Sequence, residues 1–195
     1  MITAFDDLRE IQHRDHIPEF LNKYGLTGNA AELGTYLGDF AETLLKTWSG
    51  KRLNLVDPYR HYQAGEYVDG TAIDHATGRP VDFEIVFWRA HARLNPYPAA
   101  YFIRKTSAEA VTMFEDGSLD FVYVDANHSF EHVTEDLKLW WPKLAAGGLM
   151  GLHDCYQHSD SRLNCGVFDA MWDFSESIKQ RPRLTLCTTA WFAKL

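Results

Sequence analysis

The chain has 195 residues, 46% of them hydrophobic, which predicts a single domain (residues 1–195) with a sizeable core. Its formal net charge of -8 argues against nucleic acid or a membrane surface as the main partner, because phosphate-rich surfaces would repel it. Three cysteines without a C-x-x-C pair, an acidic start unlike a signal peptide and no membrane-length apolar run together predict a reduced, cytoplasmic protein.

Apolar segments typical of strands alternate along the chain with segments of helical pattern. Residues 1–28 are expected to form a helical N-terminal cap, in which Pro18 suits the first turn of a second helix. The predicted strands are Ala30–Leu33, Leu53–Val56, Tyr101–Ile103, Phe121–Val124, Leu149–Leu152, Leu184–Thr189 and Ala190–Leu195. The predicted helices are Phe40–Trp48, Ala108–Phe114, Glu131–Leu144 and Val167–Lys179. This alternation predicts a doubly wound α/β fold, with a parallel sheet covered on both faces and closed by an antiparallel hairpin.

Residues 59–100 interrupt this alternation. The segment is rich in glycine, proline and aromatic residues, and it predicts a long irregular insertion that acts as a lid or binding loop. Its aromatic residues could wall an organic acceptor, or they could bury a loop core or an oligomer contact: Tyr59, Tyr62, Tyr67, Phe87 and Trp88. The sequence does not separate these interpretations, and it leaves a homodimer open.

A glycine-containing segment, Glu32 to Gly38, joins the first strand to a helix. A strand end, a glycine pair and a helix N-terminus let the backbone approach a nucleotide-like ligand closely. The glycine spacing departs from the G-x-G-x-x-G pattern that cradles a pyrophosphate. Glu32 would repel a phosphate but would suit a cationic amino group. The segment therefore favours a cofactor without phosphates over NAD, and a plain strand–turn–helix connection is the alternative.

Two further segments fit such a cofactor. Asp57 ends the second apolar run 19 residues after Gly38, where a carboxylate can meet a ribose diol; capping of its own turn is the alternative role. Ser107 follows the third strand and could cap the next helix. Ser107 and Ala108 also lie where an adenine edge is expected in a doubly wound sheet.

The candidate metal ligands and the candidate general base lie at the ends of the fourth and fifth apolar strands. Asp125 ends one strand and His128 follows it, while His153 and Asp154 end the next strand. Neighbouring strand ends would bring Asp125, His153 and Asp154 together as ligands of a divalent cation, which could clamp two substrate oxygens. Adjacent residues of a regular strand point to opposite faces of the sheet, so His153 and Asp154 can face the same site only if the chain turns at the strand end. His128 is the candidate general base, because an unperturbed imidazole titrates near working pH.

The helix after His128 carries both polar and aromatic residues. His132 and Asp136 are interpreted as solvated side chains. Trp140 and Trp141 are expected to pack the end of this helix against the sheet rather than to stack on a cofactor.

These motifs resemble class I S-adenosylmethionine-dependent methyltransferases, most closely the small-molecule O-methyltransferases of the macrocin and mycinamicin sugar type. The resemblance runs from about Ala30 to Asp154 and rests on Glu32–Gly38, Asp57, Thr106–Glu109, Asp125–His128 and Pro142–Asp154. It implies a Rossmann-like seven-stranded sheet whose last strand is antiparallel. It also implies S-adenosylmethionine as the cofactor, bound by Glu32, Gly34, Thr35, Tyr36, Gly38, Asp57, Ser107, Ala108 and Asp125.

In metal-dependent members of this group, an aspartate at one strand end and an acidic pair at the next hold magnesium. Asp125, Asp154 and the base His128 match that pattern, whereas His153 replaces an acid; this leaves the metal open or shifts it towards a softer cation. The resemblance implies an in-line transfer in which His128 takes a proton from a hydroxyl of a sugar or natural product. The alternatives are an NAD-dependent oxidoreductase and a cofactor-binding module without catalysis.

Overall fold

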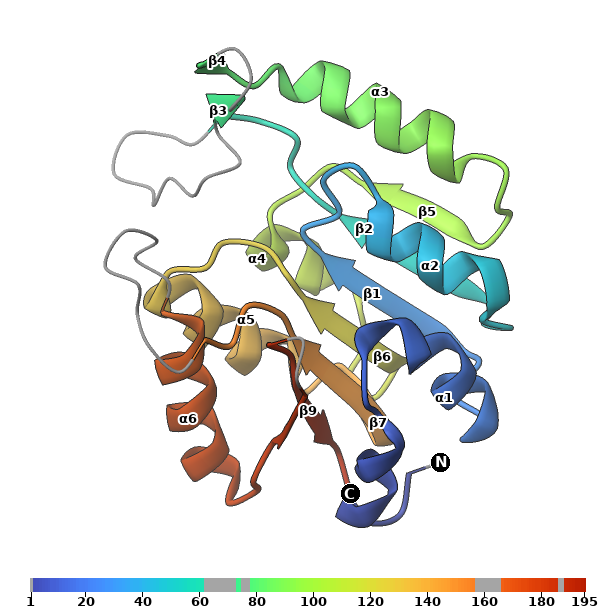
Figure 1. Cartoon of the computed structure of the whole chain (residues 1–195), viewed down its shortest axis with the longest axis vertical. Helices are drawn as coiled ribbons and strands as arrows, with labels where there is room; N and C mark the ends of the chain where they lie inside the picture. Colours follow the sequence, from blue (N-terminus) through green and yellow to red (C-terminus); the bar gives the residue numbers. More distant parts are fainter. Residues whose placement is uncertain (1, 62–72, 75–77, 157–165, 186–187) are drawn as a thin grey trace.

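A computed structural model describes residues 2–61, 73–74, 78–156, 166–185 and 188–195 of the chain. It contains a central sheet with helices on both faces (Figure 1). Tyr62, Tyr67, Cys165 and Cys187, which the sequence analysis considered, lie outside the described residues, and Cys155 is a buried free cysteine. Among the helices of the described ranges, none has both the length and the apolar character that crossing a membrane requires.

The central sheet has seven strands in the order β5-β2-β1-β6-β7-β9-β8. Five strands are parallel, β9 is antiparallel to β7, and β8 is antiparallel to β9. Their bounds are β1 Asn29–Leu33, β2 Arg52–Val56, β5 Ala100–Ile103, β6 Leu119–Val124, β7 Leu144–Leu152, β8 Arg183–Leu184 and β9 Ala190–Ala193. A separate two-stranded sheet pairs β3 (Ile73–Asp74) with β4 (Arg79–Pro80). The predicted doubly wound sheet with an antiparallel last strand is confirmed.

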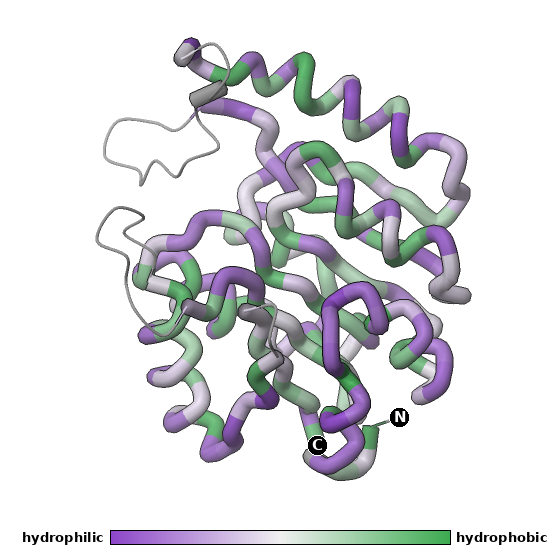
Figure 2. Tube along the Cα trace, in the orientation of Figure 1, coloured by the Kyte–Doolittle hydropathy of each residue, from purple (hydrophilic) through white to green (hydrophobic). Residues whose placement is uncertain are grey.

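Two layers of helices cover the sheet. One layer contains α4 (Ser107–Ala110), the 3₁₀-helix η4 (Val111–Met113), α5 (Phe130–Trp140) and α6 (Val167–Ile178). The other contains the 3₁₀-helices η1 (Phe5–Glu10) and η2 (Arg14–His16), with α1 (Ile17–Lys23) and α2 (Asp39–Thr47). Along α6, hydrophobic and hydrophilic stretches alternate, as expected for a helix with one buried face (Figure 2).

Side chains of the central strands contribute alternately to the two cores. On β6, Val122 and Val124 belong to the core under α5 and α6, whereas Phe121 and Tyr123 belong to the core under α1 and α2. This period of two, with both faces apolar, is what a parallel sheet between helical layers requires. All four of these side chains are buried.

The chain changes direction across the sheet at β1. This strand pairs in parallel with β2 on one side and with β6 on the other. The loop after β1 leads towards β2, and the loop after β6 leads towards β7, so the two loops diverge. Ligands of open α/β sheets bind in the crevice that such a divergence leaves at the carboxyl ends of the strands.

The region predicted as an irregular insertion contains a regular helix, α3 (Phe83–Leu94), so that prediction was wrong for these residues. Asp82 caps α3 by accepting hydrogen bonds from two backbone amides. Tyr59 packs on Phe87 of α3, with ring centroids 5.2 Å apart, inside a small core of this region, while Trp88 is 61% exposed. The flanking glycines and prolines masked a helical pattern of buried residues: Phe83, Val86, Phe87, Ala90 and Leu94.

The helix predicted over Glu131–Leu144 ends earlier, at Trp140. Trp141 still has helical backbone angles, but Pro142 has no backbone N–H with which to continue the helix, and β7 already begins at Leu144. Trp140 is fully buried, with its ring centroid 5.1 Å from that of Phe114, and Trp141 packs on Phe174 of α6. Trp141 also packs on Phe192 of β9, and Trp140 belongs to the core under the sheet, so the predicted packing of this helix end against the sheet is confirmed.

Candidate functional site

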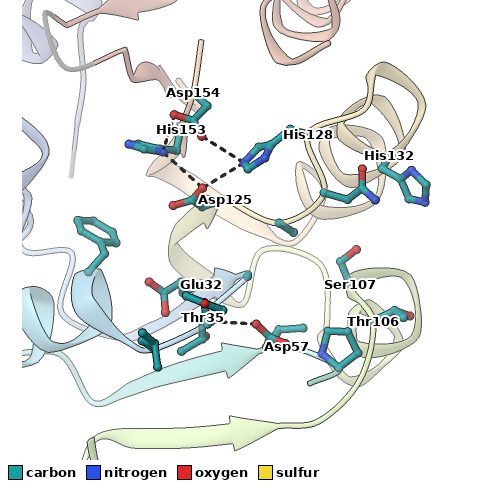
Figure 3. A pocket seen from close by; sticks show the side chains of 18 of the residues that line it. Glu32, Thr35, Asp57, Thr106, Ser107, Asp125, His128, His132, His153 and Asp154 are labelled. Atoms are coloured by element: carbon teal, nitrogen blue, oxygen red, sulfur yellow. Dashed lines mark hydrogen bonds and ion pairs between the residues drawn. The ribbon is translucent and has the colours of Figure 1, made fainter. Parts of the chain in front are cut away.

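A cavity of about 400 Å³ opens at the carboxyl ends of β1, β2, β6 and β7. Its walls come from the loops that follow these strands, from the start of α4 and from η2. Figure 3 shows the polar side chains of this cavity, with Asp125, His128, His153 and Asp154 gathered on one side and Asp57, Thr106 and Ser107 on another. The cavity therefore lies at the crevice that the strand order creates.

Gly34 brings two loops of the cavity into contact. Its backbone has φ +85°, and a Cβ at this position would lie 2.0 Å from the carbonyl oxygen of Asp125. Only glycine tolerates both conditions, so the loop after β1 can touch the loop after β6. Gly38, also predicted to contact the cofactor, lies outside the cavity wall. It precedes α2 and faces Leu94 of α3.

Glu32 and Thr35 form a buried polar part of the cavity wall. Glu32 is 2% exposed, and its burial raises the pKa of the carboxyl well above the ordinary value. Glu32 Oε2 and Thr35 Oγ1 have no hydrogen-bond partner within the described ranges. Buried polar atoms are normally paired, so these two indicate a polar ligand in the cavity. A cationic group beside Glu32 would favour the ionised carboxylate and lower that pKa.

Asp57 supports a turn and faces the cavity. Its Oδ2 accepts a hydrogen bond of 2.9 Å from the backbone N–H of Tyr36, and its Oδ1 accepts one of 2.8 Å from that of Tyr59. Tyr36 has φ +47°, a left-handed conformation that this hydrogen bond helps to hold. Asp57 and Tyr36 both line the cavity. Asp57 therefore stabilises two local turns, the alternative role predicted for it. This role does not exclude the predicted contact with a ribose, because each carboxylate oxygen can accept more than one hydrogen bond.

The cap of α4 is Thr106, and the prediction that Ser107 caps this helix was wrong. Thr106 Oγ1 accepts from the N–H of Glu109, and Glu109 Oε2 accepts from the N–H of Thr106. This reciprocal pair is a capping box. Ser107 is the first residue of α4 and lines the cavity, whereas Ala108 is not among the lining residues.

Four side chains meet where β6 and β7 end (Figure 3). His128 Nε2 lies 3.3 Å from Asp125 Oδ1 and 3.4 Å from Asp154 Oδ2. His153 Nδ1 lies 3.4 Å from Asp125 Oδ1 and 3.1 Å from Asp154 Oδ1. Asp154 has φ +55°, so the chain turns immediately after β7. This turn meets the condition under which adjacent His153 and Asp154 can face the same mouth.

The charges in this cluster shift the protonation of its members. Burial by itself would raise the pKa of Asp125, but His128 and His153 outweigh it and lower that pKa to about 2. The pKa of Asp154 is also lowered, because His153 outweighs the effect of its burial. Burial lowers the pKa of His153, yet the two carboxylates raise it to about 9. Both aspartates are therefore anionic at neutral pH.

The three residues placed best for a cation differ from the predicted set. Ligand atoms of Asp125, His128 and Asp154 lie within 4.8 Å of one another, so His128 takes the place that was predicted for His153. His153 Nε2 is instead 3.0 Å from Nη1 of Arg14. Arginine can only donate, so this contact holds when His153 Nε2 is unprotonated, whereas the carboxylates favour the imidazolium. Two carboxylates and an imidazole fit a borderline divalent cation better than magnesium.

Three residues have positions that the sequence analysis missed. Arg14 and His132 line the cavity, and Asp136 is buried, 2% exposed, although it and His132 were interpreted as solvated. Burial raises the pKa of Asp136 to about 7, with Ser107 as a hydrogen-bond partner that opposes the shift. A helical count from Val133 and Trp140 would have placed Asp136 on the buried stripe. No comparable local signal pointed to Arg14.

Comparison with known proteins gives one family. The family model described as a methyltransferase domain matches residues 31–155. A curated protein, the uncharacterized protein y4gI of Sinorhizobium fredii, is 38% identical over 52 residues. This match covers 27% of the chain and only 6% of the length of that protein.

Solved structures share the fold at low sequence identity. The O-methyltransferase NovP has a TM-score of 0.67 and is 12% identical, with 96% of this chain and 80% of that chain covered. An O-methyltransferase from Bacillus cereus in complex with SAH has a TM-score of 0.60 and is 11% identical, with coverages of 100% and 93%. A spermidine synthase from Thermotoga maritima has a TM-score of 0.61 and is 15% identical, with coverages of 100% and 62%. Since a spermidine synthase shares this fold, the reaction must be argued from the site.

Proposed function

Because the chain belongs to the methyltransferase-domain family, we propose that it transfers a methyl group from S-adenosylmethionine to a hydroxyl group of a small molecule, such as a sugar or another natural product. The observation that carries this proposal is one cavity with two unlike parts. Glu32 supplies a buried, unpaired carboxylate oxygen, and His128 supplies a base between two carboxylates. An NAD-dependent oxidoreductase and a module without catalysis find no support in the family match.

The cofactor part suits a cationic ligand without phosphates. Glu32 would accept a hydrogen bond from the cofactor's ammonium group, next to the backbone of the glycine turn. Asp57 would accept a hydrogen bond from the ribose diol in addition to those from the backbone N–H groups of Tyr36 and Tyr59, since one carboxylate oxygen can accept more than one hydrogen bond. Ser107 lines the cavity where the adenine is expected. When bound, the cofactor supplies an electrophilic methyl group on a sulfonium.

His128 would act as the general base. A proton that His128 accepts at Nε2 lies between Asp125 Oδ1 and Asp154 Oδ2, at 3.3 and 3.4 Å. These two carboxylates would stabilise the imidazolium that forms when His128 takes the proton of the acceptor hydroxyl. The methyl group would pass to the hydroxyl oxygen as its bond to sulfur breaks, and S-adenosylhomocysteine would be the leaving group. The remaining contribution of the site is alignment of hydroxyl and methyl, which a preformed cavity provides.

A divalent cation is a second candidate participant, favoured by the closeness of the Asp125, His128 and Asp154 ligand atoms. Such a cation would be held by these three side chains and would stabilise negative charge on the acceptor oxygen. Nε2 of His128 cannot bind a cation and accept a proton at the same time. The two roles of His128 therefore exclude each other and can be separated by experiment.

The setting and partners of the protein remain predictions from its sequence. We propose a cytoplasmic enzyme whose acceptor is a small molecule rather than nucleic acid or a membrane component, since its net charge is -8. A homodimer is compatible with this proposal.

The test is calorimetric titration of S-adenosylhomocysteine into the protein, first with EDTA and then with magnesium, manganese or zinc. We expect micromolar binding in EDTA, with release of protons, because a cationic ligand would ionise Glu32. Glu32→Gln keeps the shape of the side chain and is expected to bind roughly tenfold more weakly without proton release. Absence of binding under every condition would overturn the proposed cofactor.

Metal titrations separate the two roles of His128. If the three side chains hold a cation, Asp154→Asn and His128→Ala should each weaken cation binding at least tenfold. If His128 is only the base, His128→Ala should leave cation binding unchanged. Transfer at full rate after exhaustive chelation would exclude the cation from the mechanism.

A further inference from the structure

His132 lies in the first turn of α5 and lines the cavity. Figure 3 shows it beside Ser107 and Thr106, on the side of the cavity away from Glu32 and His153. His132 is partly buried and is separate from the Asp125, His128 and Asp154 cluster. The function proposed above does not use this imidazole.

Ser129 determines which ring nitrogen of His132 carries the proton. Its hydroxyl oxygen accepts a hydrogen bond of 3.3 Å from the N–H of His132 and lies 2.7 Å from His132 Nδ1. Ser129 is only 5% exposed, and its Oγ has no further partner among the described residues. Donating its single proton to Nδ1 satisfies the hydroxyl, since the opposite arrangement would leave that buried proton unpaired. His132 Nε2 then carries the ring hydrogen.

The lining residues follow the order of the parts of the proposed cofactor. Glu32 lies at the position for the ammonium group, Asp57 follows at the position for the ribose, and Ser107 and His132 lie beyond Asp57. Adenine presents N1, N3 and N7 as hydrogen-bond acceptors. Within the described ranges, Nε2 of His132 has no hydrogen-bond partner, so it is available as a donor at this end.

We propose that His132 donates a hydrogen bond from Nε2 to a ring nitrogen of the cofactor's adenine, in a tautomer held by Ser129. This inference rests on the proposed use of S-adenosylmethionine. It assigns adenine recognition to a side chain of α5 in addition to the start of α4. A donor at this position favours adenine over bases that present a hydrogen at the same ring position.

Two substitutions separate the two nitrogens of the imidazole. The amide oxygen of asparagine can replace the accepting Nδ1, but this side chain does not reach the position of Nε2, whereas the amide nitrogen of glutamine can replace the donating Nε2. The test measures binding of S-adenosylhomocysteine and its 1-deaza, 3-deaza and 7-deaza analogues by calorimetry in EDTA. The proteins compared are the unsubstituted chain, His132→Asn and His132→Gln, with His16→Asn as a control at an exposed histidine outside the cavity.

We expect one of the three analogues to bind the unsubstituted protein about tenfold more weakly than S-adenosylhomocysteine, the loss of one hydrogen bond. His132→Asn should weaken the binding of S-adenosylhomocysteine by a similar factor. This variant should then bind S-adenosylhomocysteine and that analogue with equal affinity. His132→Gln should keep part of the discrimination, and His16→Asn should keep all of it. This pattern is a double-mutant cycle between a side chain and a ligand atom.

Two results would overturn the proposal, and they are distinguishable. If the unsubstituted protein binds S-adenosylhomocysteine but His132→Asn weakens all analogues equally, His132 makes no hydrogen bond to the adenine. If the unsubstituted protein binds none of the four compounds, the proposed cofactor is wrong and the role of His132 is wrong with it. Nitrogen chemical shifts of the His132 ring check the tautomer independently, because an Nδ1–H form in the free protein contradicts the role given to Ser129.

Discussion

The cofactor end and the acceptor end, the two parts of the cavity proposed above to bind the cofactor and the acceptor hydroxyl, are formed by different kinds of groups. At the cofactor end, backbone groups of tight turns shape the site around Gly34, Tyr36 and Asp57. At the acceptor end, charged side chains from distant segments converge, and Arg14 and His153 are 139 residues apart in the chain. The cofactor end depends on local backbone geometry, whereas the acceptor end depends on the balance of charges that the fold brings together.

Two aspartates illustrate that balance. Asp125 and Asp136 are both buried, yet the pKa of Asp125 is lowered to about 2 and that of Asp136 is raised to about 7. Burial acts in the same direction on both carboxyls. His128 and His153 outweigh the effect of burial at Asp125, while the only described group that lowers the pKa of Asp136 is the Ser107 hydroxyl, which is uncharged. Residue type and burial alone therefore do not decide the charge of a carboxyl in this molecule.

The largest expected effect is at the acceptor end. His128→Ala should lower kcat by roughly 10²–10⁴-fold, the usual contribution of a general base, while binding of S-adenosylhomocysteine stays within about twofold. Single-turnover assays and calorimetry measure the two quantities. A variant that transfers methyl groups at the full rate would remove His128 from the mechanism. Recovery of activity with excess cation would instead make His128 a ligand.

At the cofactor end, Gly34→Ala should destabilise the protein by about 3 kcal/mol or more, because the new Cβ overlaps the carbonyl of Asp125. Gly117→Ala is the matched control, since Gly117 also has positive φ, +70°, but nothing within 4 Å of the added Cβ. There we expect about 1 kcal/mol, from backbone strain alone. Urea denaturation compares the two, and equal losses would show that close approach at Gly34 is unimportant.

Asp136 predicts how stability depends on pH. Its pKa is raised from 3.8 to about 7 in the folded protein, so the folded state binds a proton more tightly than the unfolded chain. The resulting stability is fully present below pH 4 and is lost as pH rises through 7. Between pH 5 and 8 this loss amounts to roughly 2–3 kcal/mol. Asp136→Asn should flatten that part of the profile, and an unchanged profile would show that another group causes it.

The smallest expected effect is at Asp57. Asp57→Asn should weaken the binding of S-adenosylhomocysteine about tenfold, because an amide has one acceptor oxygen in place of two. The 2′-deoxy analogue should be less affected by the same substitution if the carboxylate binds the diol. Calorimetry of the four combinations gives the coupling between side chain and hydroxyl. Unchanged affinity for S-adenosylhomocysteine would leave Asp57 as a support of its turn only.

Much of the fold could be predicted because its determinants are local. Apolar runs such as Phe121–Val124 and the glycines after Glu32 are visible within a few residues of sequence. Most strands lie close to their predicted positions, although β7 begins five residues before the predicted start and β8 ends five residues before the predicted end. Helix α3 was not predicted, because glycines and prolines on both sides of it suggested a loop. The burial of Asp136 was not predicted, because an acidic residue on a helix is usually solvated. Its position on the buried stripe of α5 is nevertheless a local signal.

The sequence by itself determined the order of the central strands and of most helices, the doubly wound architecture, the glycine turn beside Asp57 and the presence of Asp125 and His128 at one strand end. Only the tertiary structure decided that Arg14 contacts His153, that His128 belongs with Asp125 and Asp154 to the candidate cation site, and that His132 lines the cavity. The physical reason is the distance along the chain over which each kind of interaction acts. Periodicity and turn preference act between neighbours in the chain, whereas contacts between side chains from separate loops depend on how those loops pack.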